Sequence, residues 1–66
     1  MKIYLNGEVR DLAPGSNVAA LLAAADFAQR RIAVEVNREI VPKSRHEQHE
    51  LHDGDRVEIV HAMGGG

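Results

Sequence analysis

The chain has 66 residues, of which eight are basic and ten acidic, and a formal charge of −2 with its histidines neutral. This length suits a single domain, residues 1–66, that buries only about 60% of the surface its unfolded chain exposes. The absence of cysteine excludes disulfides, thiolate metal sites and cysteine nucleophiles, and it favours a reducing, cytoplasmic location. The acidic balance and the scarcity of aromatic residues argue against nucleic-acid binding, and no apolar run is long enough for a membrane span.

The first twelve residues predict a β-hairpin. Apolar and polar residues alternate before Asn6-Gly7, the pair that best tolerates the positive φ angles of a type I′ turn. We expect the inward face to carry Ile3, Leu5, Val9 and Leu12. The outward face then carries Lys2, Tyr4, Glu8 and Arg10.

A short helix follows the hairpin. Pro14-Gly15 ends the second strand, and either Ser16 or Asn17 can cap the next N–H groups. The apolar residues after the cap fall at i, i+3, i+4 and i+7, which places them on one helical stripe: Val18, Leu21, Leu22 and Ala25. We expect the helix to end near residue 25 or 26, with Phe27 packed into the core.

Three further strands complete the predicted order. In residues 32–36, Ile32, Val34 and Val36 alternate with Ala33 and Glu35, which predicts a strand. Asn37-Arg38 then forms a tight turn, and residues 39–41 form a strand that Pro42 ends. Ser44 and Glu47 have capping-box spacing, which predicts one helical turn before Leu51. A turn at 53–55 leads to a last strand with Val57 and Ile59 directed inward. The order β-β-α-β-β-β predicts an α+β fold in which one helix packs across one mixed sheet.

Residues 62–66 are predicted to form a flexible tail that ends in Gly64, Gly65 and Gly66. Three extended glycines reach roughly 10 Å and carry no Cβ, so they can enter a narrow channel in another protein. The terminal carboxylate of Gly66 is then the candidate reactive group. It becomes electrophilic only after activation, for example as an acyl-adenylate, and a sulfur nucleophile can then convert it to a thiocarboxylate.

The sequence resembles the ThiS family of β-grasp, ubiquitin-like sulfur carriers of thiamine biosynthesis over essentially its whole length. The resemblance rests on these segments in this order: Ile3-x-Leu5-Asn6-Gly7-Glu8, Leu21-Leu22, Ile32-Ala33-Val34-Glu35-Val36-Asn37, Val41-Pro42, Asp53-Gly54-Asp55-x-Val57-Glu58-Ile59-Val60 and Gly65-Gly66. Arg38-Glu39 departs from the Gly-Glu that the family often has at that turn.

The resemblance implies sheet order 2-1-5-3-4, with the first and last strands parallel at the centre. It implies a carrier that is not itself an enzyme, binds no cofactor and is a monomer on its own. The implied partners are a ThiF-type adenylating enzyme that uses ATP, a cysteine desulfurase or other persulfide donor, and a ThiG-type thiazole synthase. Two alternatives stay open: a carrier of another pathway, such as the small subunit of molybdopterin synthase, and a ubiquitin-like interaction module without terminal chemistry.

Two further groups of residues are candidates for function. Exposed apolar residues on the open sheet face form a candidate docking patch that consists of Tyr4, Val60, Ala62 and Met63. We expect Tyr4 and Val60 to lie close together in this patch. His46, His49 and His52 recur every third residue, but such spacing does not converge on an α-helix, so we expect a solvated connector and no metal site. His61 is expected to be a partly buried histidine at the end of the last strand.

Overall fold

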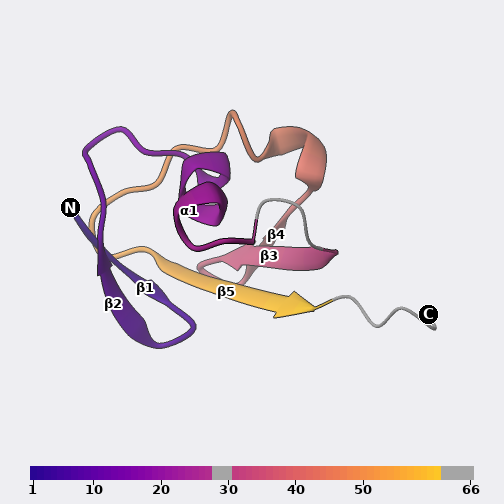
Figure 1. The fold of residues 1–66 in the computed structure, drawn as a ribbon, viewed down its shortest axis with the longest axis horizontal. Helices are drawn as coiled ribbons and strands as arrows, with labels where there is room; N and C mark the ends of the chain where they lie inside the picture. The colour runs from indigo at the N-terminus through magenta and orange to yellow at the C-terminus, as the bar shows by residue number, and fades with distance from the viewer. Residues whose placement is uncertain (28–30, 62–66) are drawn as a thin grey trace.

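The computed structural model describes residues 1–27 and 31–61. Its elements are β1 (Lys2–Leu5), β2 (Glu8–Asp11), α1 (Val18–Ala24), β3 (Ile32–Val36), β4 (Glu39–Val41), the 3₁₀ turn η1 (Lys43–Arg45) and β5 (Arg56–His61). The strands form one sheet of order β2-β1-β5-β3-β4, in which β1 and β5 are parallel and the other pairs antiparallel. Helix α1 lies across one side of this sheet (Figure 1). The predicted strand order is confirmed.

Both two-residue hairpin turns that the sequence predicts are present. Asn6 and Gly7 have φ angles of 50° and 87°, and Asn37 and Arg38 have φ angles of 51° and 70°. Positive φ at both central positions is the requirement of a type I′ turn, whose twist matches that of the strands it joins. Arg38 adopts this conformation despite its Cβ, so the second turn carries backbone strain that the first avoids.

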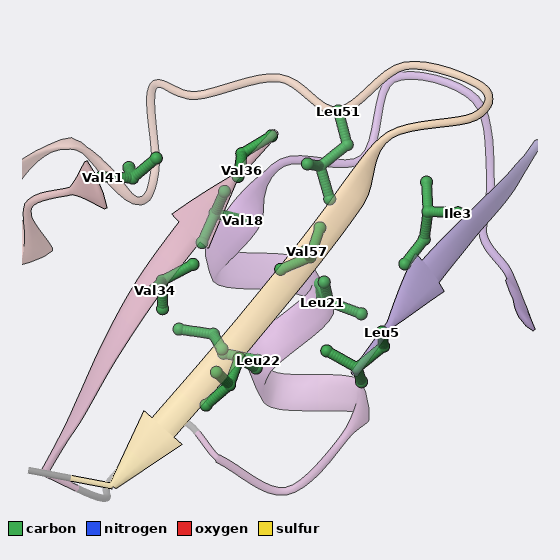
Figure 2. Close-up of a cluster of buried hydrophobic side chains, with 11 residues drawn as sticks. Ile3, Leu5, Val18, Leu21, Leu22, Val34, Val36, Val41, Leu51 and Val57 are labelled. Carbon is green, nitrogen blue, oxygen red and sulfur yellow. The ribbon is translucent and has the colours of Figure 1, made fainter. Parts of the chain in front are cut away.

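The core lies between the sheet and the helix. Figure 2 shows side chains from β1, β3 and β5 converging on the inner stripe of α1. Its buried members are Ile3, Leu5, Val18, Leu21, Leu22, Val34, Val36, Val41, Leu51, Val57 and Ile59. The predicted inward residues of the helix and of β1, β3 and β5 are therefore confirmed, with Ala25 and Phe27 half-buried against this cluster.

Val9 is the exception among the predicted core residues. The two-residue turn pairs Val9 with Tyr4, and directly opposed residues of an antiparallel pair lie on the same side of the sheet. Val9 is therefore on the face away from the helix and is 58% exposed, so the prediction that it faces inward is wrong. By the same register Glu8 and Arg10 lie on the helix side and not on the outward face, although both are exposed as expected. Leu12, just past the end of β2, is half-buried against the core as expected.

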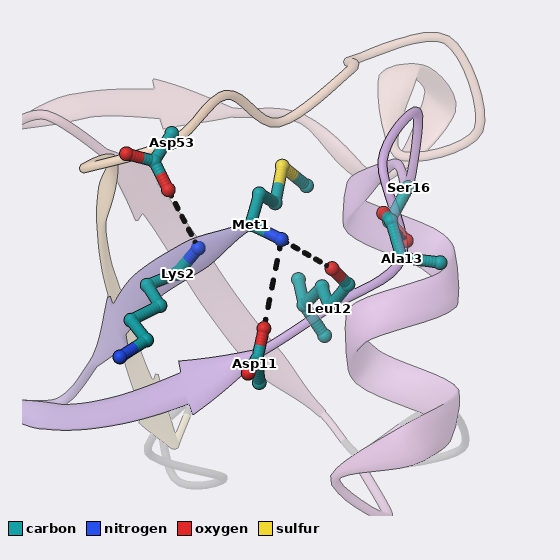
Figure 3. Close-up of polar contacts among 7 residues, drawn as sticks. All are labelled: Met1, Lys2, Asp11, Leu12, Ala13, Ser16 and Asp53. Atoms are coloured by element: carbon teal, nitrogen blue, oxygen red, sulfur yellow. Dashed lines mark hydrogen bonds and ion pairs between the residues drawn. The ribbon is translucent and has the colours of Figure 1, made fainter.

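Asn17 caps helix α1. Its side-chain oxygen accepts a hydrogen bond from the backbone N–H of Ala20 at 2.8 Å. Ser16, the alternative cap, donates its hydroxyl proton to the carbonyl oxygen of Ala13 at 2.7 Å (Figure 3). The helix ends where Asp26 enters the left-handed region at φ 67°, close to the predicted boundary.

The connector between η1 and β5 supplies backbone carbonyls to the start of the helix. The N–H groups of Val18 and Ala19 donate to the carbonyl oxygens of His49 and His46, both at 3.0 Å. The first N–H groups of a helix have no partner within it, so these bonds satisfy donors that would otherwise be unpaired. The connector is thereby attached to the helix through its backbone.

The predicted helical turn is present, but Ser44 does not cap it. The turn η1 begins after Pro42, which is at its N-cap position with φ −63°, and no side chain there accepts a hydrogen bond. Strand β4 ends at Val41, and the fixed φ of Pro42 starts the turn before Ser44 is reached. Ser44 is therefore within the turn, and the prediction of a capping box is wrong.

The start of β1 is joined to the turn before β5. The backbone N–H of Lys2 donates to a carboxylate oxygen of Asp53 at 2.7 Å (Figure 3). Gly54, at φ 87°, donates its N–H to the carbonyl oxygen of Lys2 at 2.7 Å, which confirms the predicted turn. No helix within residues 1–27 and 31–61 has the length and hydropathy needed to cross a membrane.

Candidate functional site

Strand β5 leads directly into the predicted tail, residues 62–66, which lies outside the described residues. Strand β3 pairs with β5 from Val36 opposite Val57 to Ile32 opposite His61. Strand β1 pairs only with the first part of β5, and its last partner is Val57. The final residues of β5 therefore have a neighbouring strand on one side only.

Asn6 extends the support of β5 beyond the end of β1. Its backbone N–H donates to the carbonyl oxygen of Val57 at 2.9 Å. Its side-chain oxygen accepts the backbone N–H of Ile59 at 2.8 Å. The chain turns away from β5 at Asn6, so this side chain takes the place of the backbone group that a longer β1 would have offered.

Asn37 holds the beginning of β5 from the opposite side. Its backbone N–H donates to the carbonyl oxygen of Arg56 at 2.7 Å, and its side-chain oxygen accepts the N–H of Arg56 at 3.0 Å. Its side-chain amide donates to a carboxylate oxygen of Asp55 at 3.0 Å. The first residue of each hairpin turn thus anchors β5. From the sequence, both asparagines were predicted only as turn residues.

The sheet face opposite α1 collects the exposed apolar side chains. Among the described residues, every large hydrophobic side chain that is exposed lies on this open face. The exposed fractions are 40% for Tyr4, 58% for Val9, 70% for Ile40 and 56% for Val60. Val9 is opposite Tyr4 on β1, so the two lie on the same side of the sheet. Ile40 is opposite Glu35 on β3, and the same face of β3 is opposite Glu58 and Val60 on β5, so Ile40 and Val60 also share this side. Val9 and Ile40 were not among the predicted docking residues, although Ile40 alternates with buried Val41.

Tyr4 and Val60 share the open face but are not neighbours. The parallel register places Arg56 beside Tyr4, and Val60 lies four residues further along β5, or roughly 13 Å at the rise of a strand. The expectation that the two lie close together is wrong, because it ignored where β1 and β5 begin to pair. The guanidinium carbon of Arg56 lies 5.5 Å from the centroid of the Tyr4 ring, in cation–π geometry.

A shallow hollow opens beside this pair, at the end of the first hairpin turn. Its volume is about 600 Å³ and its lining consists of Tyr4, Asn6, Gly7, Arg56, Val57 and Glu58. The other predicted docking residues, Ala62 and Met63, and the predicted tail residues Gly64, Gly65 and Gly66 lie outside the described residues.

The three histidines of the connector have different surroundings. His46 is buried, with 9% of its surface exposed, and its Nε2 donates to the carbonyl oxygen of Val41 at 3.0 Å. The prediction of a solvated connector is wrong for His46, because the bonds between connector and helix direct it inward. His49 is half-buried and His52 is exposed. In the part of the chain that the structure describes, no His, Asp and Glu side chains form a group of three that could hold a metal ion.

His61 is exposed, not partly buried as predicted. Its ring lies 6.0 Å from the Phe27 ring, centroid to centroid, in an edge-on arrangement. Helix α1 ends at Ala24, so it does not extend over the last residue of β5. Phe27 is the side chain that packs against this histidine.

A five-stranded mixed sheet of order 2-1-5-3-4, crossed by one helix, defines the β-grasp, ubiquitin-like class of small proteins. The model of the ThiS family matches residues 3–66. The chain belongs to the ThiS family.

Individual relatives agree with this assignment. The chain is 33% identical over 66 residues to the sulfur carrier protein ThiS of Escherichia coli, and the match covers all of both chains. It resembles the crystal structure of the thiamine biosynthesis protein ThiS from Geobacter metallireducens with a TM-score of 0.87, 35% identity and full coverage of both chains. It is also 47% identical over 66 residues to a thiazole synthase of Paramagnetospirillum magneticum, and it spans 20% of the length of that relative.

Proposed function

We propose that this protein is a sulfur carrier of thiamine biosynthesis. The observation that supports this most directly is the match to the sulfur carrier of Escherichia coli over the whole of both chains. The β-grasp fold supports it further, because the central strand β5 ends at His61, only a few residues before the glycine segment in the sequence. The described residues then act as the folded body that presents this segment to other proteins.

The proposed chemistry takes place at the carboxylate of Gly66. An oxygen of this carboxylate attacks the α-phosphorus of ATP, forms an acyl-adenylate and displaces pyrophosphate. The terminal sulfur of a persulfide attacks the acyl carbon and displaces AMP. A thiol then attacks the donor's sulfur in the resulting acyl disulfide, forms a new disulfide with it, and releases the outer sulfur as a thiocarboxylate on Gly66. Gly64 and Gly65 allow this end to enter a channel too narrow for side chains.

The activating chemistry belongs to partner proteins in this proposal. A ThiF-type adenylating enzyme binds the ATP, and a cysteine desulfurase or other persulfide donor supplies the sulfur. A thiazole synthase of ThiG type accepts the sulfur, and the thiazole synthase relative with a matching segment supports this choice of acceptor. The carrier is regenerated in each cycle and acts in the cytoplasm as a cosubstrate, not as an enzyme.

The open face of the sheet is the proposed docking surface for these partners. It carries Tyr4 and Val60, and Ala62 and Met63 extend the proposed surface toward the tail. An exposed apolar surface of this kind stabilises a complex when a partner covers it. Docking through the face would bring a partner's active site within reach of Gly66.

Intact-mass spectrometry tests the proposed chemistry. The protein is incubated with ATP, the adenylating enzyme and a persulfide donor, and the mass gain expected from replacement of one oxygen by sulfur should appear and map to Gly66. Deletion of Gly66 should abolish this gain and leave the melting temperature unchanged. A wild-type protein that gains no sulfur, or gains it at another residue, would contradict the proposal.

Val60→Asp tests the docking surface separately. We expect it to slow adenylation at least tenfold with little change in melting temperature, since Val60 is exposed. Val60→Thr is the matched control, because it keeps the branched shape and introduces no charge. Unchanged adenylation kinetics in Val60→Asp would show that this part of the face is not used.

A further inference from the structure

The open face has a pair of like charges at its centre. Glu35 on β3 and Glu58 on β5 are directly opposed in the antiparallel register. Opposed residues of such a pair have Cβ atoms only about 4.5–5.5 Å apart, and like charges at this spacing destabilise a sheet. The fold therefore carries an electrostatic cost at this position.

Neither glutamate is in an ion pair with another described residue. Among the described residues, no Lys, Arg or His nitrogen lies within 4.0 Å of a carboxylate oxygen of either glutamate. Arg56 is two residues before Glu58 on the same strand and the same face, but its guanidinium lies over the ring of Tyr4. A positively charged side chain of a partner protein could therefore pair with the two carboxylates.

Apolar side chains lie beside the pair on two sides. Ile40 is opposite Glu35 on the neighbouring strand, and Val60 is opposite Ala33, one step further along the same face. Glu35 is half-buried, whereas Ile40 and Val60 are exposed. The face thus combines a central negative charge with apolar side chains next to it at Ile40 and Val60, a pattern complementary to a basic side chain with apolar neighbours.

We propose that the open face binds thiazole synthase, and that the synthase inserts one Arg or Lys side chain between Glu35 and Glu58 while its apolar side chains cover Ile40 and Val60. This inference rests on the proposed sulfur-carrier function. The relative named thiazole synthase, which contains a segment 47% identical to this chain, supports the choice of occupant. A second copy of the chain is a poorer fit, because a symmetric pairing of the two faces would bring four carboxylates together.

Opposite changes in stability and in binding distinguish this role from a structural one. Glu58→Lys places an opposite charge across from Glu35, so its melting temperature should equal or exceed that of the wild type. The same change should weaken binding to thiazole synthase at least tenfold, measured by calorimetry at low salt. The double variant Glu35→Gln/Glu58→Gln should weaken binding by a similar factor and reduce its dependence on salt concentration.

A matched control removes the same charge elsewhere. Glu8 is opposite Leu5 and Glu39 is opposite Val36, so both are exposed glutamates on the helix side of the sheet. The double variant Glu8→Gln/Glu39→Gln should bind thiazole synthase with wild-type affinity. An equal loss of affinity in this control would show that only the net charge matters and would overturn the proposal.

Three other results would also overturn it. The first is wild-type affinity for thiazole synthase in Glu58→Lys and in the double glutamine variant. The second is loss of binding to the adenylating enzyme alone, which would assign the pair to that partner. The third is a wild-type dimer in solution that the glutamate substitutions alter. The mass assay for sulfur on Gly66 is independent of these measurements, so failure of the carrier function would be recognised separately.

Discussion

The side-chain oxygen of Asn6 accepts the backbone N–H of Ile59 at 2.8 Å, although the two residues are 53 positions apart in the sequence. The bond joins the first hairpin turn to the strand that leads toward the glycine segment. Asn6 has two roles that require different properties: its φ of 50° forms the turn, and its side chain supports the neighbouring strand. A glycine in place of Asn6 could form the turn but has no side chain to support the strand.

Replacement of Asn6 by glycine should separate these two roles. Asn6→Gly keeps the positive φ of the turn but leaves the N–H of Ile59 without its partner. We expect a loss of about 1 kcal/mol in the free energy of unfolding, which lowers the melting temperature by about 4–8 °C in a domain of this size. Hydrogen exchange should accelerate at the amide of Ile59 more than at that of Val57.

Asn6→Asp is the matched control, because its carboxylate can accept the same hydrogen bond and tolerates the left-handed conformation. It should restore slow exchange at the amide of Ile59. Exchange at this amide that is equally slow in Asn6→Gly and in the wild type would show that the side-chain bond does not hold the strand.

Replacement of Arg38 by glycine in the second hairpin turn should stabilise the protein. Arg38 has a φ of 70°, a left-handed conformation that is strained for a residue with a Cβ. In Arg38→Gly the free energy gained by relief of this strain exceeds the free-energy cost of the greater conformational entropy of the unfolded chain. We expect a net gain of about 0.5 kcal/mol and a melting temperature higher by roughly 2–4 °C. Arg38→Ala removes the same charge but keeps a Cβ, so it should give no gain. A gain of equal size in both variants would attribute the effect to the charge.

His46 should contribute to stability in a way that His52 does not. His46→Ala removes a buried ring and its hydrogen bond to the carbonyl oxygen of Val41, which should cost about 1–3 kcal/mol in denaturant unfolding. His52→Ala changes an exposed side chain and should stay within about 0.5 kcal/mol of the wild type. Equal effects of the two substitutions would contradict the assignment of His46 to the core.

Zinc titration should distinguish a structural connector from a metal site. His46 donates to a carbonyl in the interior while His52 faces solvent, so the histidines of the connector have no common direction. We expect calorimetry at neutral pH to show no tight, stoichiometric binding of Zn²⁺. Tight binding that is lost in a variant with His46, His49 and His52 all replaced by alanine would refute this expectation.

Most of the fold could be predicted because it depends on short-range patterns. Alternation with period two identified the inward residues of β1, β3 and β5, and the i, i+3, i+4 spacing identified the inner stripe of α1. Asn6-Gly7 and Asn37 identified the positions of both turns, since asparagine and glycine tolerate positive φ, whereas Arg38 adopts it with strain. The order of the strands came from the family resemblance and not from these patterns.

The incorrect predictions were made from the character of single residues, whereas their neighbours in the fold decided the outcome. Val9 was assigned to the core from its hydrophobicity, but the register across the turn decided its side of the sheet. His46 was assigned to solvent from its polarity, but the carbonyl oxygen of Val41 gives it a buried partner. The burial of His61 was overestimated because helix α1 ends before it could cover that position.

The amino-acid sequence alone determined the kind of each element, the positions of the two hairpin turns and the glycine segment, because these depend on residues within a few positions of one another. Only the tertiary structure decided which groups meet across the sheet. It paired Glu35 with Glu58, placed Arg56 beside Tyr4, and brought the side chain of Asn6 to Ile59. Such pairings depend on strand register and on contacts between distant segments, and no local pattern in the chain encodes them.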